Sequence, residues 1–411
     1  MLVRPSPCWP SVDEHVKSGA LSLGMKRQPI GVGGYRERAR QVLPSMAWAY
    51  LDGGADDHVT MDANVAAFRR WRLRQQVLRG VTKPDISTVM AGTRVALPVA
   101  LAPVGLTGFF RWNADVLAAR AAERAGTRLI LSTGSSWTLE EVAEATEMNH
   151  WFQLYPYGDR TKVGALIDRA SAAGYTALFV TVDVQARGNR EGERRTGMGV
   201  PLRVTPRALG DFAMHPVWTW NLLRHGRAAA IHYRDSGGNG VAAAASSITA
   251  QDRYMQADLN WVDLAWMRDH WHGKLYVKGV LQGDDAVRCV HELGADGVVV
   301  SNHGGRQLDR GAATLEALPG VVEALAGRGE VYLDGGVRRG TDVITALALG
   351  ADGVLIGRAY TYGVAVAGEA GVSDILATFT DDIRRGLILM GCPSVAALDR
   401  SWVMPATITG G

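Results

Sequence analysis

The chain has 411 residues, of which 47% are hydrophobic and 21% charged, a composition typical of globular proteins that excludes a largely disordered chain. Its 44 Lys and Arg residues are nearly balanced by 41 Asp and Glu residues, and the formal net charge of +3 gives no sign of a nucleic-acid-binding surface. Three widely separated cysteines, Cys8, Cys289 and Cys392, indicate a reducing compartment and predict neither a disulfide framework nor a metal site.

Neither a membrane span nor a signal peptide is predicted. No apolar run reaches the roughly 18 residues of a bilayer-crossing helix. The first residues carry prolines and charges where a signal peptide has its apolar core. The sequence therefore predicts a soluble, cytoplasmic protein.

The N-terminal part is predicted to be an extension followed by a helix. Residues 1–34 mix Pro, Gly, Ser and charge without periodicity, so we expect a flexible extension there. From about Tyr35 the apolar spacing predicts a helix that Gly53 and Gly54 end. Residues 69–74, RRWRLR, alternate basic and apolar side chains and predict an edge strand. The apolar face of the helix comprises Leu43, Met46, Ala47, Tyr50 and Leu51.

Eight short apolar runs follow, separated by turns and helical segments. Continuous apolar runs, rather than alternating ones, suit parallel strands buried on both faces. Eight of them with intervening helices predict an α/β fold, a (β/α)8 TIM barrel over residues 35–395, with a tail at 396–411. A doubly wound sheet is the competing fold, but it rarely has eight units. The runs are 97–102, 128–132, 150–154, 177–183, 274–279, 296–301, 330–334 and 352–357.

The segment of roughly 190–260, after the fourth run, is too long for an ordinary connection. Its apolar and basic residues fit a peripheral contact with a membrane surface. The favoured interpretation is a loop packed on the barrel or on a neighbouring subunit. The residues concerned are Trp218, Trp220, Leu222, Leu223, Arg224 and Arg227.

Polar residues gather where the predicted strands end, which is where barrels of this kind carry their active sites. The last two runs end in the glycine-rich turns LDGGVRRG and IGRAY. Exposed backbone N–H groups and arginines at these turns predict a phosphate site, and hence a phosphorylated cofactor. The residues expected to hold it are Asp334, Gly336, Arg338, Gly357 and Arg358.

The run SNHGGRQLD, residues 301–309, is the sharpest signal in the chain. It places His303 three residues before Arg306 at a strand end, which sets a base beside a group that clamps a carboxylate. A lone histidine is more often structural, but so polar a run would make a poor core.

Together with LDGGVRRGTDVITALALGADGVLIGRAY, this run resembles the FMN-dependent α-hydroxy acid oxidase and dehydrogenase family, which includes glycolate oxidase, lactate oxidase and mandelate dehydrogenase. The resemblance covers residues 35–395, and its motifs are highly specific. It implies FMN as the cofactor, a small 2-hydroxy acid as the substrate, and a homo-oligomer, often a tetramer, as the assembly.

The resemblance also assigns site residues by position. His303 matches the base, Asp183 the carboxylate that orients it, Tyr155 a tyrosine near the substrate hydroxyl, and Lys278 the lysine that faces flavin N1 and O2. The positions that match groups binding the substrate carboxylate are Tyr50, Arg190 and Arg306. The further flavin contacts expected are Val104, Gly105, Ser132, Gln153, Thr181 and Ser301.

These roles agree with elementary chemistry. A neutral histidine suits proton removal near pH 7, and a buried aspartate favours the imidazolium that then forms. An arginine binds a carboxylate through paired hydrogen bonds, which a lysine cannot do. Hydride transfer and carbanion formation are both compatible with the sequence, as are oxygen, a quinone or another carrier as electron acceptor.

Departures from the family pattern concern the size of the substrate. Gly134 stands where glycolate oxidase carries a tryptophan over the substrate, which predicts room for a bulky, aromatic side chain as in the mandelate dehydrogenase branch. The segment EGERRTGMGV after Arg190 lacks the family's Asn-Arg-Phe-like run. We expect Trp137, three residues beyond Gly134, to be a packing residue.

The leading hypothesis is an enzyme that oxidises a mandelate-like (S)-2-hydroxy acid to the 2-oxo acid. An alternative keeps the flavin and changes the substrate to an amine, a carrier-bound acid or a peptide of a biosynthetic pathway. A flavin-binding protein without turnover is disfavoured, because a binding module has no need of a base.

Overall fold

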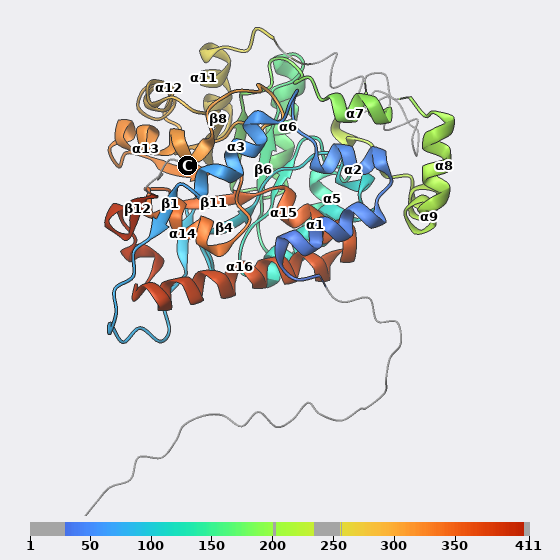
Figure 1. The fold of residues 1–411 in the computed structure, drawn as a ribbon. Helices are drawn as coiled ribbons and strands as arrows, with labels where there is room; N and C mark the ends of the chain where they lie inside the picture. Colours follow the sequence, from blue (N-terminus) through green and yellow to red (C-terminus); the bar gives the residue numbers. More distant parts are fainter. Residues whose placement is uncertain (1–28, 200–202, 234–254, 256, 407–411) are drawn as a thin grey trace, which may run out of the picture.

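The computed structural model describes residues 29–199, 203–233, 255 and 257–406, and its centre is a barrel of eight parallel strands (Figure 1). The order within the sheet is β4-β11-β10-β9-β8-β7-β6-β5, and a bridge between Leu101 and Leu129 joins the two outer strands. All eight predicted runs form strands, which confirms the TIM barrel. The strands are β4 (Val99–Leu101), β5 (Ile130–Ser132), β6 (Trp151–Leu154), β7 (Ala177–Thr181), β8 (Lys274–Val280), β9 (Gly297–Val300), β10 (Glu330–Leu333) and β11 (Gly353–Ile356).

Helices between the strands cover the outer face of the barrel, and the longest of them runs beside its neighbours across one side of the molecule (Figure 1). Their apolar faces and the outward-facing strand residues form the main hydrophobic core. The helices are α4 (Ala114–Arg124), α5 (Leu139–Glu144), α6 (Arg160–Ala172), α11 (Trp261–His270), α12 (Gly283–Val287) with a π-helical turn (Arg288–Glu292), α13 (Thr314–Leu325), α14 (Gly340–Ala348), α15 (Arg358–Ala367) and α16 (Glu369–Met390).

A second, smaller core fills the inside of the barrel. Trp151, Phe179, Tyr276 and Tyr332 are fully buried there, and the centroids of adjacent rings lie 4.9–5.7 Å apart. The hairpin of β2 (Thr88–Met90) and β3 (Thr93–Val95) adds Met90 to this core, against the first residue of β11. The N-terminal end of the barrel is therefore filled, and a ligand cavity belongs at the opposite end.

The N-terminal helix differs from the expectation in two respects. Pro44 divides it into α1 (Gly31–Val42) and α2 (Ser45–Asp52), and α1 begins inside the expected extension. Residues 1–28 of that extension lie outside the described residues. The helix α2 still turns Met46, Ala47 and Leu51 to the core, and the chain then continues into α3 (Val59–Phe68).

The expected tail from residue 396 onward is packed in its described part. After two short 3-10 turns, β12 (Val403–Pro405) pairs antiparallel with β1 (Trp71–Leu73), so residues 69–74 do contain the predicted edge strand. Trp402 is buried beside it. The structure thus extends the packed unit to residue 406.

The long segment after β7 contains α7 (Glu191–Thr196), α8 (Pro206–Met214), α9 (Pro216–His225) and a 3-10 turn (Ile231–Tyr233). The indole N–H of Trp218 donates to the carbonyl of Phe109 at 2.7 Å, so this part packs on the barrel, as the favoured interpretation predicts. The small-residue tract 237–247 lies outside the described residues. No helix in the described part of the chain has the length and apolar character to span a membrane.

Candidate active site

A cavity opens at the C-terminal ends of the barrel strands, beneath α2 and α7. Most of the site residues expected from the sequence line it: Tyr50, Val104, Gly105, Gly134, Tyr155, Arg190, Lys278, His303, Arg306, Asp334, Gly336, Arg338, Gly357 and Arg358. The others lie at the ends of the same strands but outside the cavity wall: Ser132, Gln153, Thr181, Asp183 and Ser301. The fold therefore brings together residues that are more than 250 positions apart.

His303 lies at the centre of the site, just after β9. Its Nδ1 is 3.0 Å from Oδ1 of Asp183, and its Nε2 is 3.3 Å from the hydroxyl of Tyr155. The residue adopts a left-handed backbone conformation (φ +58°), which is unusual for a side-chain-bearing residue, and its N–H donates to Ser301 Oγ at 3.1 Å. The imidazole is thus held from both sides, with one nitrogen facing the cavity.

Burial sets the protonation state of this histidine. It lowers the pKa of His303 below the usual value, and the nearby Asp183 opposes the shift without outweighing it. Burial alone would raise the pKa of Asp183, but His303 and Lys278 hold it below its ordinary range. Near pH 7 the pair is consequently a neutral imidazole beside a carboxylate, which is the arrangement of a base ready to accept a proton.

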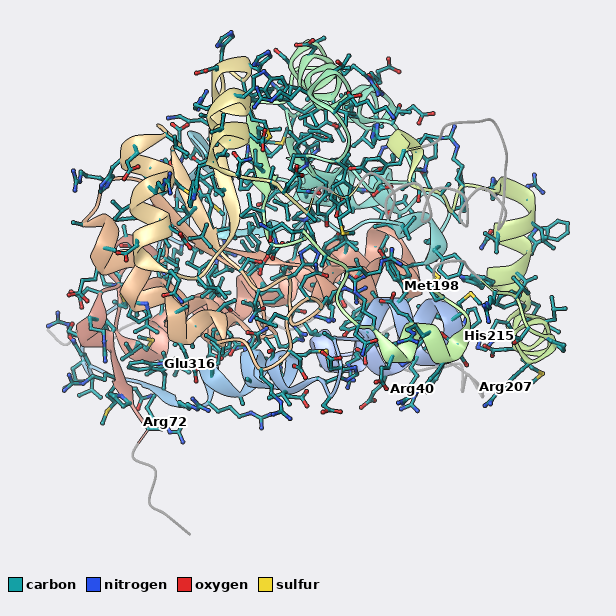
Figure 2. The ribbon with its side chains drawn as sticks, turned by 90° about the horizontal axis from the view of Figure 1, so that it is seen from above. Arg40, Arg72, Met198, Arg207, His215 and Glu316 are labelled. Carbon is teal, nitrogen blue, oxygen red and sulfur yellow. The ribbon has the colours of Figure 1, made fainter. Side chains whose placement is uncertain are left out.

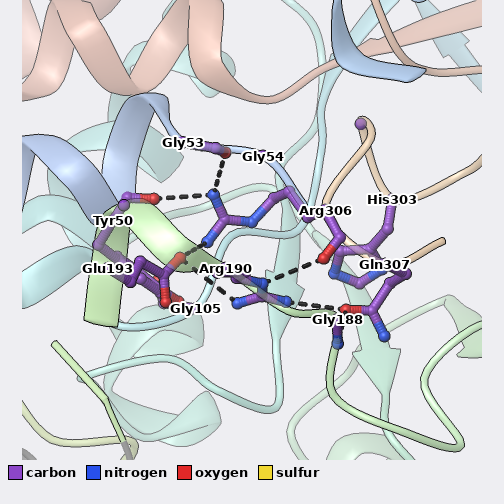
Figure 3. A network of polar contacts seen from close by, with 12 residues as sticks. Tyr50, Gly53, Gly54, Gly105, Gly188, Arg190, Glu193, His303, Arg306 and Gln307 are labelled. Carbon is purple, nitrogen blue, oxygen red and sulfur yellow. Dashed lines mark hydrogen bonds and ion pairs between the residues drawn. The ribbon is translucent and has the colours of Figure 1, made fainter. Parts of the chain in front are cut away.

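Arg306 and Arg190 enter the cavity side by side (Figure 3). Nη1 of Arg306 donates to the carbonyls of Tyr50 and Gly53, both at 2.8 Å, which fixes the guanidinium under the end of α2. Nε of Arg190 donates to the carbonyl of Arg306 at 3.1 Å, and Nη2 donates to Gln307 Oε1 at 2.9 Å. Two cations held in this way suit a carboxylate ligand.

Lys278 and Asp334 form an ion pair in the wall of the cavity. Nζ of Lys278 lies 2.9 Å from Oδ2 of Asp334 and donates to Ser301 Oγ at 2.8 Å. Burial tends to lower the pKa of Lys278, but Asp334 and Asp183 outweigh it and raise the pKa above its usual value. The lysine therefore presents a permanent positive charge to whatever lies above it.

Comparison with known proteins decides which family combines these features. A family model described as FMN-dependent dehydrogenase matches residues 39–405. The chain belongs to the FMN-dependent dehydrogenase family. It is 42% identical over 373 residues to L-lactate dehydrogenase of Caulobacter vibrioides, covering 89% of this chain and 95% of that one. It is 36% identical over 390 residues to (S)-mandelate dehydrogenase of Pseudomonas putida, covering 94% and 96%.

Solved structures of the FMN-dependent dehydrogenase family share the fold along nearly the whole chain. The monotopic membrane protein (S)-mandelate dehydrogenase superposes with a TM-score of 0.87 at 36% identity, covering 92% of this chain and all of the other. A mandelate oxidase with (S)-2-phenylpropionate gives 0.75 at 33% identity, covering 90% and 97%. The protein is accordingly an FMN-dependent hydroxy acid oxidoreductase.

The phosphate end of the cavity fits FMN. Arg358, at the first position of α15, is partly buried and donates to the carbonyls of Gly304 and Gly53, while its buried Nε has no partner in the described part of the chain. Burial and the charge of Arg306 lower the pKa of Arg358 to about 10. Neither Arg358 nor Arg338 forms an ion pair with a carboxylate of the described residues, and a phosphate would neutralise both.

The flavin end also fits. Nε2 of Gln153, Oγ1 of Thr181 and Oδ1 of Asp334 are buried polar atoms without a hydrogen-bond partner among the described residues. Buried polar atoms are normally paired, so these three mark places where ligand atoms belong. The glycine at position 336 is explained by packing rather than by a ligand. A Cβ there would lie 2.1 Å from the carbonyl oxygen of Asn64 on α3, so only glycine fits.

Two polar residues that contact the arginines of the site, Glu193 and Gln307, were not predicted from the sequence. Glu193 lines the cavity and contacts Arg306, and its position three residues after Arg190 on α7 was the available signal. Gln307 lies inside the SNHGGRQLD run and holds Arg190. Asn302, in the same run, exchanges two 2.8 Å hydrogen bonds with Asn64 of α3. Among the described residues, no cluster of His, Cys, Asp and Glu has the arrangement of a metal site.

Proposed function

We propose that the protein oxidises (S)-2-hydroxy acids with a bulky, aromatic side chain, such as mandelate, to 2-oxo acids. The observation that carries this proposal is Gly134, which contributes no side chain to the cavity wall. Leu106, Phe110 and Tyr157 line the same cavity, so a ring would meet apolar neighbours. The name (S)-mandelate dehydrogenase of one relative supports the proposal, and the name L-lactate dehydrogenase of another provides its competitor.

The roles of the residues follow from the geometry. Arg306 and Arg190 bind the substrate carboxylate, and the hydroxyl of Tyr50 lies on the same wall, with the ring beside the Arg306 guanidinium at 5.0 Å. His303 accepts the proton that leaves the substrate, and Asp183 stabilises the imidazolium formed. Tyr155 holds the hydroxyl near the base. FMN, when bound, supplies the acceptor for the two electrons, and Lys278 stabilises the added negative charge.

An anaerobic experiment tests the proposal. The FMN-loaded protein is mixed separately with (S)-mandelate, L-lactate and glycolate, and the flavin absorbance is followed. We expect mandelate to bleach the flavin fastest. Bleaching by lactate or glycolate alone would retain the reaction and reject the aromatic substrate. No bleaching by any of the three would reject simple hydroxy acids and favour an amine, a carrier-bound acid or a peptide.

A graded series at one position tests the role of the cavity wall. Gly134→Ala adds one methyl group and should retain most of the activity on mandelate. Gly134→Trp should lower kcat/KM for mandelate at least tenfold more than for glycolate, because the indole fills the space of the substrate ring. Equal losses for both acids would show that Gly134 does not set substrate size.

We also propose that the segment α8–α9 contacts a membrane surface, since the solved (S)-mandelate dehydrogenase is a monotopic membrane protein. Trp218 and Leu222 face the barrel, whereas five apolar side chains are 59–79% exposed at the edge of the molecule marked by Arg207 and His215 in Figure 2. The exposed side chains are Leu209, Met214, Val217, Trp220 and Leu223. Assembly into a homo-oligomer and a cytoplasmic location stay predictions.

Sedimentation with vesicles of phosphatidylethanolamine and phosphatidylglycerol tests the membrane contact. We expect the protein to sediment with the vesicles, and the double variant Trp220→Ser, Leu223→Ser to remain in the supernatant. Leu308→Ser, which changes an equally exposed leucine (76%) outside this segment, is the matched control. Equal sedimentation of all three proteins would reject α8–α9 as the contact surface.

A further inference from the structure

Glu193 places a carboxylate among the cations that bind the substrate (Figure 3). Its Oε1 lies 2.8 Å from Nη2 of Arg306 and 3.7 Å from Nη1 of Arg190, and its side chain is only 6% exposed. One oxygen therefore contacts both guanidinium groups. A buried acid is costly unless it is paired, and here the pairing partners are the substrate-binding arginines themselves.

The charge balance of this group is simple. Arg306 and Arg190 contribute two positive charges, and Glu193 removes one, so the clamp carries a net charge of +1. The two guanidinium groups repel each other: burial lowers the pKa of Arg306, Arg190 lowers it further, and Glu193 opposes both. Without the glutamate the clamp would carry two positive charges in a buried space, where charge interactions are strong.

Most of the other N–H donors of the two guanidinium groups form hydrogen bonds within the protein. Arg306 uses Nη1 on the carbonyls at the end of α2, and Arg190 uses Nε and Nη2 on the loop that contains Gln307. The donors directed toward Glu193 are Nη2 of Arg306 and Nη1 of Arg190, and all three residues line the cavity. The substrate carboxylate therefore binds next to a carboxylate that is already present.

We propose that Glu193 sets the charge of this clamp to match one carboxylate and so selects 2-hydroxy acids without a second carboxylate in the side chain. A monocarboxylate brings the group to neutrality, whereas a dicarboxylate leaves an unbalanced negative charge beside Glu193. The inference rests on the proposed function, because it names the charge class of the substrate of that same site. Arg187 also lines the cavity and is present in every variant. The decisive quantity is therefore the change in the preference between dicarboxylate and monocarboxylate when Glu193 alone is replaced.

Two acids that differ by a side-chain carboxylate, (S)-lactate and (S)-malate, test this selection in the FMN-loaded protein. Glu193→Gln keeps the shape and the acceptor oxygen and removes the charge. We expect its ratio of kcat/KM for malate to that for lactate to rise about tenfold over wild type, as expected for one charge removed from a buried site. Glu193→Asp keeps the charge and should leave the ratio within twofold.

The matched control is Glu191→Gln, which removes a charge from the same helix at a side chain that pairs with Arg195 outside the cavity. It should leave both the activity and the ratio unchanged. If Glu193 serves only to hold Arg306 in place, Glu193→Gln will lower kcat/KM for both acids alike, and the unchanged ratio will overturn the proposal.

A binding experiment separates this proposal from the proposed function. Propionate and succinate, which lack the reacting hydroxyl, are titrated against the flavin absorbance. The affinity for succinate relative to propionate should rise about tenfold in Glu193→Gln. This result is independent of turnover, so it holds even if no hydroxy acid reduces the flavin. If Glu193→Gln retains no flavin, Glu193→Ser is used instead, because it removes the same charge. If both variants lose the flavin while Glu193→Asp retains it, Glu193 serves folding and the proposal is overturned.

Discussion

The two ends of the barrel have opposite chemical character. Inside the barrel at the N-terminal end, the hairpin β2–β3 and four packed aromatic rings fill the space, and the unpaired polar atoms of these rings are neutral: the hydroxyl of Tyr276 and Nε1 of Trp151. At the C-terminal end the unpaired buried atoms include charged groups, namely Oδ2 of Asp183, Oδ1 of Asp334 and Nε of Arg358.

This difference indicates which end of the barrel binds a ligand. An unpaired buried atom of a neutral group costs about 1–3 kcal/mol, and an unpaired atom of a charged group costs more. Each of these three groups has a protein partner on its other atoms, so the atom left unpaired indicates where a ligand supplies the missing contact. The charged end is where the FMN-dependent dehydrogenase chemistry has its base and clamp.

The largest effect expected at the charged end comes from His303→Ala. The flavin should remain bound, since Lys278 and the arginines of the phosphate end are untouched, but its reduction by a 2-hydroxy acid should fall about 10³-fold because the base is gone. Stopped-flow absorbance under anaerobic conditions measures this rate. His272→Ala, an exposed histidine, is the control. Undiminished reduction in His303→Ala would remove this residue from the reaction.

A smaller and more specific effect is expected from Asp183→Asn. The Asp183 charge raises the pKa of His303 against the effect of burial, so its removal lowers that pKa further and weakens the base. Reduction should slow about tenfold or more. Activity requires neutral imidazole and is lost as pH falls through the pKa of His303, so the acid limb of the kcat/KM profile should move to lower pH. A profile that stays in place, or moves upward, would contradict the coupling of the two residues.

Much of the barrel and the site could be predicted from the sequence, because the relevant signals are local. Continuous apolar runs identify buried parallel strands, and SNHGGRQLD carries a base and a cation within four residues. The start of α1 was missed because Gly31, Gly33 and Gly34 disfavour a helix, which packing of Val32 and Tyr35 nevertheless stabilises.

The rest depends on contacts that no local pattern contains. The pair Glu193–Arg306 joins residues 113 positions apart, and β1 pairs with β12 across most of the chain although each strand has three residues. The two faces of α9 are a middle case. Trp218 and Leu222 lie four residues apart and so share one face of the helix, whereas Trp220 lies on the other face, and this much follows from the sequence. Which of the two faces is buried depends on the barrel that packs against it.

The smallest effect on activity is expected at the opposite end of the barrel, from Met90→Ala. Met90 is fully buried against the start of β11, so its truncation leaves a cavity and should lower the free energy of unfolding by about 2–4 kcal/mol. Since this end holds none of the residues that line the active-site cavity, kcat/KM should stay within twofold of wild type below the unfolding transition. Met404→Ala, at a side chain 46% exposed, should change neither quantity. A loss of activity in Met90→Ala larger than its effect on the folded fraction would mean that the two ends are coupled through the aromatic interior, and the separation between a stability end and a chemistry end would fail for this barrel.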